Sequence, residues 1–226
     1  MDYAKFTALT PRLYDYLLSH SAAPDPVLAG LIEETQASFG NLSVMQISPD
    51  QGAFMQMLTS ISKATSVVEV GTFTGYSALC MARGLAPGGR LLACDLSEEF
   101  TSVARKYWAM AGVDGRIDLR LGPALDTLRG LGAEHRFDLA FIDADKTGYA
   151  AYYEEILARM DGGGIILFDN VLWMGQVIDE ANQGEDTLAI RALNDALVAD
   201  SRVDVVMLAV GDGLTMAVKK QATGQG

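Results

Sequence analysis

The sequence predicts an α/β protein built around a doubly wound, mostly parallel sheet of seven strands, one of them antiparallel. From residue 66 onward, short apolar runs alternate with longer amphipathic stretches, the pattern of a parallel sheet that helices cover on both faces. A Gly-Asp-Gly turn joins the last two runs, which predicts a hairpin and therefore one antiparallel strand. The predicted strands span residues 66–71, 90–95, 116–121, 136–143, 164–169, 202–210 and 214–219.

The first third of the chain is predicted to be helical. Pro11 and Pro26 each follow a Thr or Asp, which is the order expected of an N-cap and the first helical turn. Ser48 and Gln51 have the spacing of a capping box, in which the two side chains bind the first N–H groups of a third helix. We therefore expect one domain over residues 1–226, with a helical cap at 1–64 and an α/β core at 65–220.

Composition limits the possible partners. Lys and Arg total 17 and Asp and Glu total 29, which gives a formal net charge of −12. Such a surface repels phosphate backbones and anionic lipids, so we expect neither nucleic acid nor membrane partners. No apolar run approaches the roughly 18 residues of a membrane helix. Cys80 and Cys94 lie in apolar runs, where we expect reduced core thiols and hence a cytoplasmic protein.

The first candidate site is a glycine loop between a predicted strand and a predicted helix. Gly71 and Gly75 let the backbone turn tightly and approach a ligand. Asp95 ends the next strand, where a carboxylate can accept hydrogen bonds from ribose hydroxyls. The loop lacks the Gly-x-Gly-x-x-Gly of dinucleotide sites, and Glu69 would repel phosphate and attract a cation. These features favour a ligand with a ribose and a cation but no phosphates, although a structural turn alone would explain the glycines.

Acidic and amide side chains follow the fourth and fifth predicted strands. Asp143 ends one strand, and Asp169 and Asn170 end the next, so the three should meet at the carboxyl edge of the sheet. Their oxygens suit Mg²⁺, Mn²⁺ or Ca²⁺, although Asp and Asn at strand ends also cap helices. Lys146 follows on the turn. Beside a dication it would lose its proton and act as a base, whereas a lone lysine is ordinarily solvated.

At these residues the sequence resembles the cation-dependent O-methyltransferases, the family of caffeoyl-CoA and catechol O-methyltransferases. The resemblance implies a Rossmann-like methyltransferase fold and S-adenosylmethionine as the cofactor. It also implies a divalent metal such as Mg²⁺ and assembly as a homodimer. The motifs that carry it are EVGTFTGYSAL (69–79), ACD (93–95), LGPAL (121–125), FIDADK (141–146) and FDNVLWMG (168–175).

The resemblance also implies roles for individual residues. Asp95 would hold the ribose hydroxyls, Ala124 would lie against the adenine, and Asp145 would help hold the methionine end. The implied metal ligands are Asp143, Asp169 and Asn170. The full implied cofactor site comprises Met45, Glu69, Gly71, Thr72, Ser77, Asp95, Ala124, Asp143 and Asp145.

The family's general base falls on Lys146, and Trp173 and Met174 are the candidates for an aromatic substrate pocket. Plant members usually have Asn where this chain has Met174 and often have Thr at the position of Ile47. This departure at Met174 disfavours a CoA ester and indicates a smaller aromatic substrate.

The expected reaction moves a methyl group from S-adenosylmethionine to a hydroxyl of a small catechol-like aromatic, either ortho-dihydroxy or ortho-amino/hydroxy. A metal-independent methyltransferase acting on nitrogen would keep Glu69 and Asp95 but would not need the metal set. A nicotinamide-dependent enzyme is disfavoured because the loop lacks the glycine pattern that binds a pyrophosphate. A non-catalytic S-adenosylmethionine-binding protein would keep the pocket without turnover.

Overall fold

The computed structural model of the protein describes residue 5 and residues 7–221. Within these residues the chain forms one seven-stranded sheet with the strand order β3-β2-β1-β4-β5-β7-β6. Strand β7 runs antiparallel to both of its neighbours, and the other pairs are parallel. The predicted fold class is confirmed, including the single antiparallel strand.

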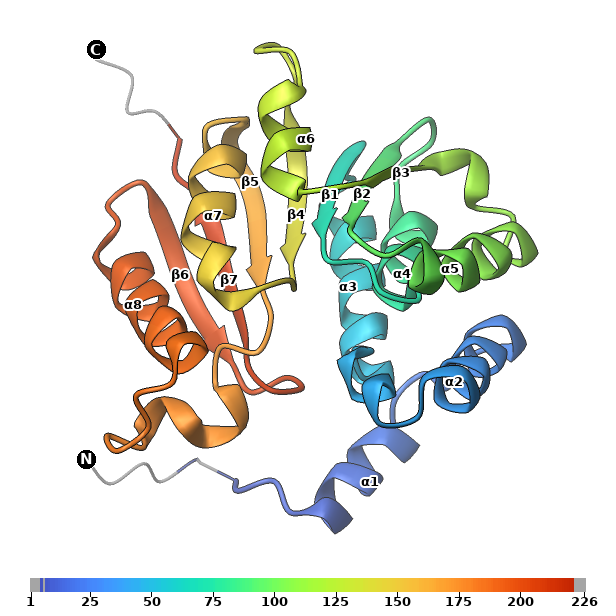
Figure 1. Ribbon diagram of the computed structural model, residues 1–226, viewed down its shortest axis with the longest axis horizontal. Helices are drawn as coiled ribbons and strands as arrows, with labels where there is room; N and C mark the ends of the chain where they lie inside the picture. The colour runs from blue at the N-terminus through green and yellow to red at the C-terminus, as the bar shows by residue number, and fades with distance from the viewer. Residues whose placement is uncertain (1–4, 6, 222–226) are drawn as a thin grey trace.

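Three helices, α1 to α3, come first; strands and helices then alternate from β1 to β6, and β7 follows β6 directly. Helix α1 lies farthest from the sheet, beyond the end of α3 (Figure 1). The helices are α1 Pro11–Ser19, α2 Pro26–Phe39, α3 Pro49–Ile61, α4 Tyr76–Gly84, α5 Glu98–Met110, α6 Ala124–Gly130, α7 Tyr149–Leu157 and α8 Glu185–Ala199. The strands are β1 Ser66–Val70, β2 Arg90–Asp95, β3 Ile117–Leu121, β4 Phe137–Ile142, β5 Met160–Phe168, β6 Val203–Leu208 and β7 Leu214–Lys219. Short 3-10 helices are η1 Gly40–Met45, η2 Asp114–Arg116, η3 Lys146–Gly148 and η4 Trp173–Ile178.

Two apolar clusters, one on each face of the sheet, form the core. Along β4, Leu139 and Phe141 belong to the cluster beneath α2, α3, α4 and α5, whereas Ala140 and Ile142 belong to the cluster beneath α6, α7 and α8. This alternation follows from the two-residue side-chain period of a strand. Because both faces are covered, the central strands are continuous apolar runs, which is why the sequence reveals them.

The helix starts agree with the expected caps at α1 and α2 but not at α3. Thr10 accepts a hydrogen bond from the N–H of Leu13, and Asp25 accepts bonds from the second helix. The capping box predicted for Ser48 is wrong. Helix α3 does begin at Pro49, but the Ser48 side chain makes no capping bond and Gln51 is turned toward a cavity.

Strand β5 is longer than predicted because it begins at Met160 rather than at residue 164. Phe137 pairs with Met160, but Leu139 pairs with Ile165, so the extra residues form an irregularity in the ladder. A glycine-rich stretch gives no apolar signal, and the sequence pattern therefore missed it. In the described residues no helix has the length and apolar character required to cross a bilayer.

The carboxyl ends of β1, β2, β4 and β5 meet at one edge of the sheet, where the strand order reverses between β1 and β4. Main-chain bonds tie these ends together. The N–H of Gly71 donates to the carbonyl of Cys94 at 2.9 Å, and the N–H of Asp143 donates to Val70 at 2.8 Å. Ligands of open α/β sheets bind at such an edge. The fold thus brings the predicted site residues to one place.

Candidate active site

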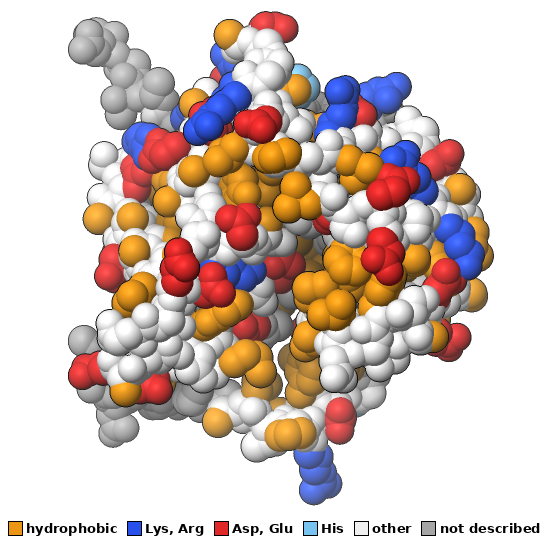
Figure 2. Space-filling model, in the orientation of Figure 1, with side chains coloured by type: hydrophobic (Ala, Val, Ile, Leu, Met, Phe, Trp, Pro, Cys, Tyr) orange, Lys and Arg blue, Asp and Glu red, His pale blue; other side chains and the backbone are white. Residues whose placement is uncertain are grey.

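A cavity of about 900 Å³ opens at this edge of the sheet. Figure 2 shows the hollow near the centre of this face, with acidic side chains inside it and apolar ones around it. Among the described residues that line it, the single Lys or Arg is Lys146. The carboxylates that line it are Asp95, Asp143, Asp145, Asp169 and Asp212. Such a cavity favours cationic ligands and disfavours phosphates.

The loop between β1 and α4 forms the floor of the cavity, and its glycines are required by geometry. Gly71 has a φ of +89°, and a Cβ there would overlap the backbone carbonyl of Asp143. Gly75 has a φ of +82°, and a Cβ would lie 2.6 Å from Ala104. A structural turn would require only the positive φ. The close approach of Gly71 to the end of β4 is a further requirement for glycine that a turn alone does not explain.

Asp95 anchors this loop. Its Oδ2 accepts hydrogen bonds from the N–H groups of Thr72 (2.9 Å) and Phe73 (2.8 Å), and its Oδ1 accepts one from Ser97 (2.8 Å). A carboxylate offers about four acceptor positions, so one remains toward the cavity. The contact of Asp95 with ribose hydroxyls, expected from the sequence, stays a prediction.

Glu69 is fully buried beneath the loop and is not among the residues that line the cavity. Its two oxygens accept bonds from the hydroxyls of Thr72 (2.9 Å) and Ser77 (2.5 Å), which themselves face the cavity. Burial raises the pKa of Glu69 to about 8. In this structure Glu69 thus reaches the cavity only through these two hydroxyls. The direct contact of its carboxylate with the cofactor, expected from the sequence, stays a prediction.

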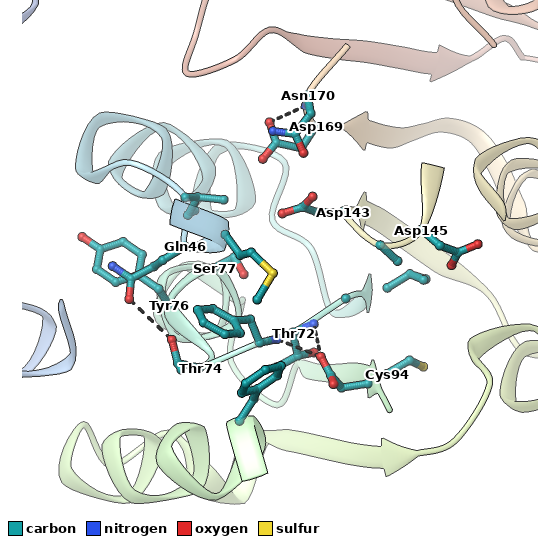
Figure 3. A pocket seen from close by; sticks show the side chains of 18 of the residues that line it. Gln46, Thr72, Thr74, Tyr76, Ser77, Cys94, Asp143, Asp145, Asp169 and Asn170 are labelled. Carbon is teal, nitrogen blue, oxygen red and sulfur yellow. Dashed lines mark hydrogen bonds between the residues drawn. The ribbon is translucent and has the colours of Figure 1, made fainter. Parts of the chain in front are cut away.

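The predicted metal set converges with Lys146 at the other end of the cavity. Lys146 is 8% exposed, and its Nζ donates to Asp143 Oδ1 at 3.0 Å and to Asn170 Oδ1 at 2.7 Å. Burial raises the pKa of both Asp143 and Asp169, and their mutual repulsion raises that of Asp169 further. Figure 3 shows Asp143 facing Asp169 and Asn170, with Asp145 lying to the side.

This donor set fits a hard cation. An ammonium group already sits between oxygens of Asp143 and Asn170, so the two oxygens converge on one cationic centre. Carboxylate and amide oxygens suit Mg²⁺, Mn²⁺ or Ca²⁺. In the described chain no group of three or more His, Cys, Asp and Glu side chains forms a metal cluster, because the third donor here is an amide.

Tyr149 holds the third bond of Lys146 and was not predicted from the sequence. Lys146 Nζ donates to the Tyr149 hydroxyl at 2.6 Å, and that hydroxyl donates to the backbone carbonyl of Asp169 at 3.2 Å. Burial raises the pKa of Tyr149 well above its usual value, so it stays a neutral phenol. Its position three residues after Lys146, at the start of α7, was the available signal.

The loop after β5 supplies the aromatic wall and is conformationally unusual. Asn170, Trp173 and Met174 all have positive φ values of +49° to +55°. The Trp173 ring lies 5.7 Å from Lys146 Nζ, while Met174 is 81% exposed at the rim. Asp212, from the turn between β6 and β7, accepts the N–H of Met174 at 2.7 Å. From the sequence, that turn was predicted only as the turn of a hairpin, and its contact with Met174 was not predicted.

The remaining predicted cofactor residues also line the cavity. Met45 ends η1 and is 43% exposed, and Ala124 begins α6. Asp145 accepts a hydrogen bond from Tyr152 at 2.6 Å, which turns its carboxylate toward α7. Phe73 and Phe100 line the cavity as an edge-to-face pair and were not predicted, because they come together only in the folded chain.

The fold and the site together define a class of protein, a Rossmann-like domain whose acidic cavity is suited to a cationic ribose ligand. Comparison with known proteins agrees. A family model described as O-methyltransferase matches residues 18–220. Probable caffeoyl-CoA O-methyltransferase 1 of Dictyostelium discoideum is 41% identical over 211 residues, which cover 92% of this chain and 91% of that protein. Caffeoyl-CoA O-methyltransferase 2 of Zea mays is 39% identical, over 90% of this chain and 81% of the relative.

Solved structures give the same answer. The O-methyltransferase from Bacillus cereus in complex with SAH superposes with a TM-score of 0.84 at 35% identity, covering 91% of this chain and 96% of that one. TomG from Streptomyces achromogenes, in complex with SAM, has a TM-score of 0.83 at 27% identity over 91% and 95% of the two chains. The chain belongs to the O-methyltransferase family and is an S-adenosylmethionine-dependent enzyme of that family.

Proposed function

We propose that the enzyme methylates a hydroxyl of a small aromatic that carries two adjacent oxygen donors, or an adjacent oxygen and nitrogen, and that it needs a divalent cation. The observation that carries this proposal is the convergence of Asp143 and Asn170 oxygens on one cationic centre. The relatives named as caffeoyl-CoA O-methyltransferases support an aromatic substrate. The acidic lining and the lone Lys146 favour a substrate without the phosphates of coenzyme A.

The residues divide the chemistry between two ends of the cavity. Thr72 and Ser77, held by the buried Glu69, would bind the cofactor end that carries the amino group, while Asp95 would bind its ribose. S-adenosylmethionine supplies the methyl group, whose transfer needs a phenolate in line with the sulfonium. Fixed positions for both reactants would supply much of the rate.

At the other end, Asp143, Asp169 and Asn170 would hold the divalent ion. When bound, the ion would lower the pKa of a substrate hydroxyl and favour the neutral amine of Lys146. Lys146 would then accept the hydroxyl proton at Nζ. The ring of Trp173, which lies beside that amine, would form one wall of the aromatic pocket.

The test is activity with and without chelator, together with Asp169→Ala. We expect catechol methylation to stop in excess chelator and to return with Mg²⁺. Asp169→Ala should abolish turnover but leave S-adenosylhomocysteine binding intact, because the cofactor residues lie elsewhere. Asp118→Ala, at an exposed position on β3, is the matched control. Full turnover in chelator, or equal rates on phenol and catechol, would contradict the proposal.

We also propose that the enzyme is a cytoplasmic homodimer. Cys80 and Cys94 are buried and free, as is usual in reducing compartments. Helix α3 carries Met57 and Ile61 one turn apart, and they are 58% and 78% exposed. These two large apolar side chains on one helix face are the candidate surface for contact with a second copy.

A further inference from the structure

The side chain of Gln51 is buried in the cavity without a hydrogen-bond partner for its amide nitrogen. Gln51 lies in the first turn of α3 and is 2% exposed, and it lines the cavity. Among the described residues, nothing accepts from its Nε2, and the neighbouring Ser48 Oγ is unpartnered as well. Buried polar groups are nearly always paired, so an orphaned donor facing a cavity indicates a ligand atom.

The fold makes room for this amide. A Cβ at Gly211, in the turn between β6 and β7, would lie 2.5 Å from Gln51 Oε1. Gly211 has a φ of +54°, and because it has no side chain, the Gln51 amide fits between α3 and that turn. The packing on the Oε1 side orients Gln51 and leaves Nε2 for the cavity.

Gln51 lies on the side of the cavity where the cation ligands are. Its amide nitrogen approaches the Asp169 carboxylate without making a full hydrogen bond. The amide has two N–H groups, so at least one is left for the cavity. At this end of the cavity, the carboxylates of Asp143, Asp169 and Asp212 only accept hydrogen bonds when ionised. The Lys146 ammonium already donates to Asp143, Tyr149 and Asn170. A neutral donor in such surroundings is suited to an oxygen of the substrate.

We propose that Gln51 Nε2 is a specificity-determining donor that binds a third oxygen on the aromatic substrate, next to the two chelating donors. The preferred substrate class is then an aromatic ring with three adjacent oxygen substituents, the third being a hydroxyl or carbonyl oxygen. This inference rests on the proposed function, because it needs the chelating pair to be held by Asp143, Asp169 and Asn170. The contact with Gln51 would make the enzyme select among catechol-like substrates by their third oxygen.

The test compares three probes under one condition with Mg²⁺: catechol, pyrogallol with three adjacent hydroxyls, and 1,2,4-benzenetriol with the third hydroxyl displaced. In the wild type, kcat/KM for pyrogallol should exceed that for the other two by about 2- to 13-fold, the usual net value of one neutral hydrogen bond. Gln51→Met keeps the length of the side chain but removes the donor, and it should bring the pyrogallol-to-catechol ratio close to one. Gln51→Leu is the second variant should the first fold poorly.

Gln56→Met, on the same helix but outside the cavity lining, is the matched control and should keep the wild-type ratio. Calorimetric Kd values for pyrogallol and catechol, measured with Mg²⁺ and S-adenosylhomocysteine, should show the same change in ratio without turnover. An unchanged ratio in both Gln51 variants would overturn the proposal. So would an equal loss for all three probes, because Gln51 would then act only by supporting Asp169. If wild type methylates none of the probes, or does so in excess chelator, the proposed function fails instead.

Discussion

At the position of Lys146, one ammonium group meets oxygens from three segments of the chain: Asp143 after β4, Asn170 after β5 and Tyr149 at the start of α7. All three N–H groups of the ammonium are therefore used. This arrangement is compatible with two roles for Lys146. It can be a fixed positive charge that positions other groups, or a general base that first loses its own proton. Two substitutions separate these roles.

Lys146→Met should lower kcat by about 10²- to 10⁴-fold, the usual contribution of a general base. Lys146→Arg keeps the charge but cannot give up its proton in a protein, so it should not restore the rate. Steady-state kinetics on catechol with saturating Mg²⁺ measures both. If Lys146→Arg recovers most of the activity, Lys146 is a positioning charge and the phenolate forms without it.

Glu69 gives the enzyme a pH dependence of stability. Its pKa is about 8 in the folded protein against an ordinary value of 4.5, so between these values the folded state holds a proton that the unfolded state has lost. The stabilisation is complete below about pH 4.5 and is lost as the pH rises through 8. Relative to Glu69→Gln, the wild type should lose up to about 1.4 kcal/mol of unfolding free energy per pH unit in this window. Urea unfolding at pH 5 to 8 measures this difference, and parallel curves for the two proteins would show that Glu69 is ionised throughout.

Sequence and structure agree where a residue's place follows from the end of a strand. The proximity of Asp143, Asp169 and Asn170 could be predicted from the sequence because neighbouring parallel strands end at the same edge of the sheet. Gln51 and Asp212 could not, because their contacts join α3 and the β6–β7 turn to that edge, and no periodicity specifies those contacts. The sequence also does not predict how deeply a side chain is buried, as the buried position of Glu69 beneath the loop shows.

At the scale of elements, the β1–α4 loop depends on how closely it approaches β4. Gly71→Ala imposes a positive φ on alanine and also forces a Cβ onto the Asp143 carbonyl, so the loop or the strand end must move. Gly88→Ala has a similar φ of +78° with nothing within 4 Å, and it isolates the cost of φ alone.

Gly88→Ala should cost about 1–2 kcal/mol, and Gly71→Ala should cost more than about 3 kcal/mol, because overlap with backbone adds to the strain. Thermal unfolding should therefore show a clearly larger drop in Tm for Gly71→Ala than for Gly88→Ala. Calorimetry should also show loss of S-adenosylhomocysteine binding in that variant only. Equal drops in Tm would mean that the contact with β4 relaxes at little cost.

The sequence predicts the elements themselves more readily than their irregularities. Every strand buried on both faces appears as an apolar run, and the hairpin appears through its turn residues. The start of β5 at Met160 does not, since Gly162–Gly164 carry no side chains whose pattern could reveal pairing. The three residues with positive φ in the loop after β5 are likewise invisible, because tertiary contacts rather than glycines hold them.

For the whole molecule, the excess of acidic residues extends into the cavity. The chain carries a formal charge of −12, and among the residues that the structure describes, five carboxylates line the cavity beside one lysine. A negative field attracts a sulfonium cofactor and a divalent ion and repels coenzyme A phosphates. Net charge and local lining thus favour the same class of ligands.

The last prediction concerns assembly. Met57 and Ile61 lie one turn apart on α3, so they present a single apolar face, whereas Val198 on α8 is equally exposed at 80% but belongs to another helix. Light scattering at micromolar concentration should give twice the 24.2 kDa of one chain. The double variant Met57→Asp and Ile61→Asp should give a monomer, because two carboxylates facing their copies would lose solvation and repel. Val198→Asp should remain a dimer. A monomeric wild type would exclude the dimer, and a dimer that survives the double variant but not Val198→Asp would place the contact on α8.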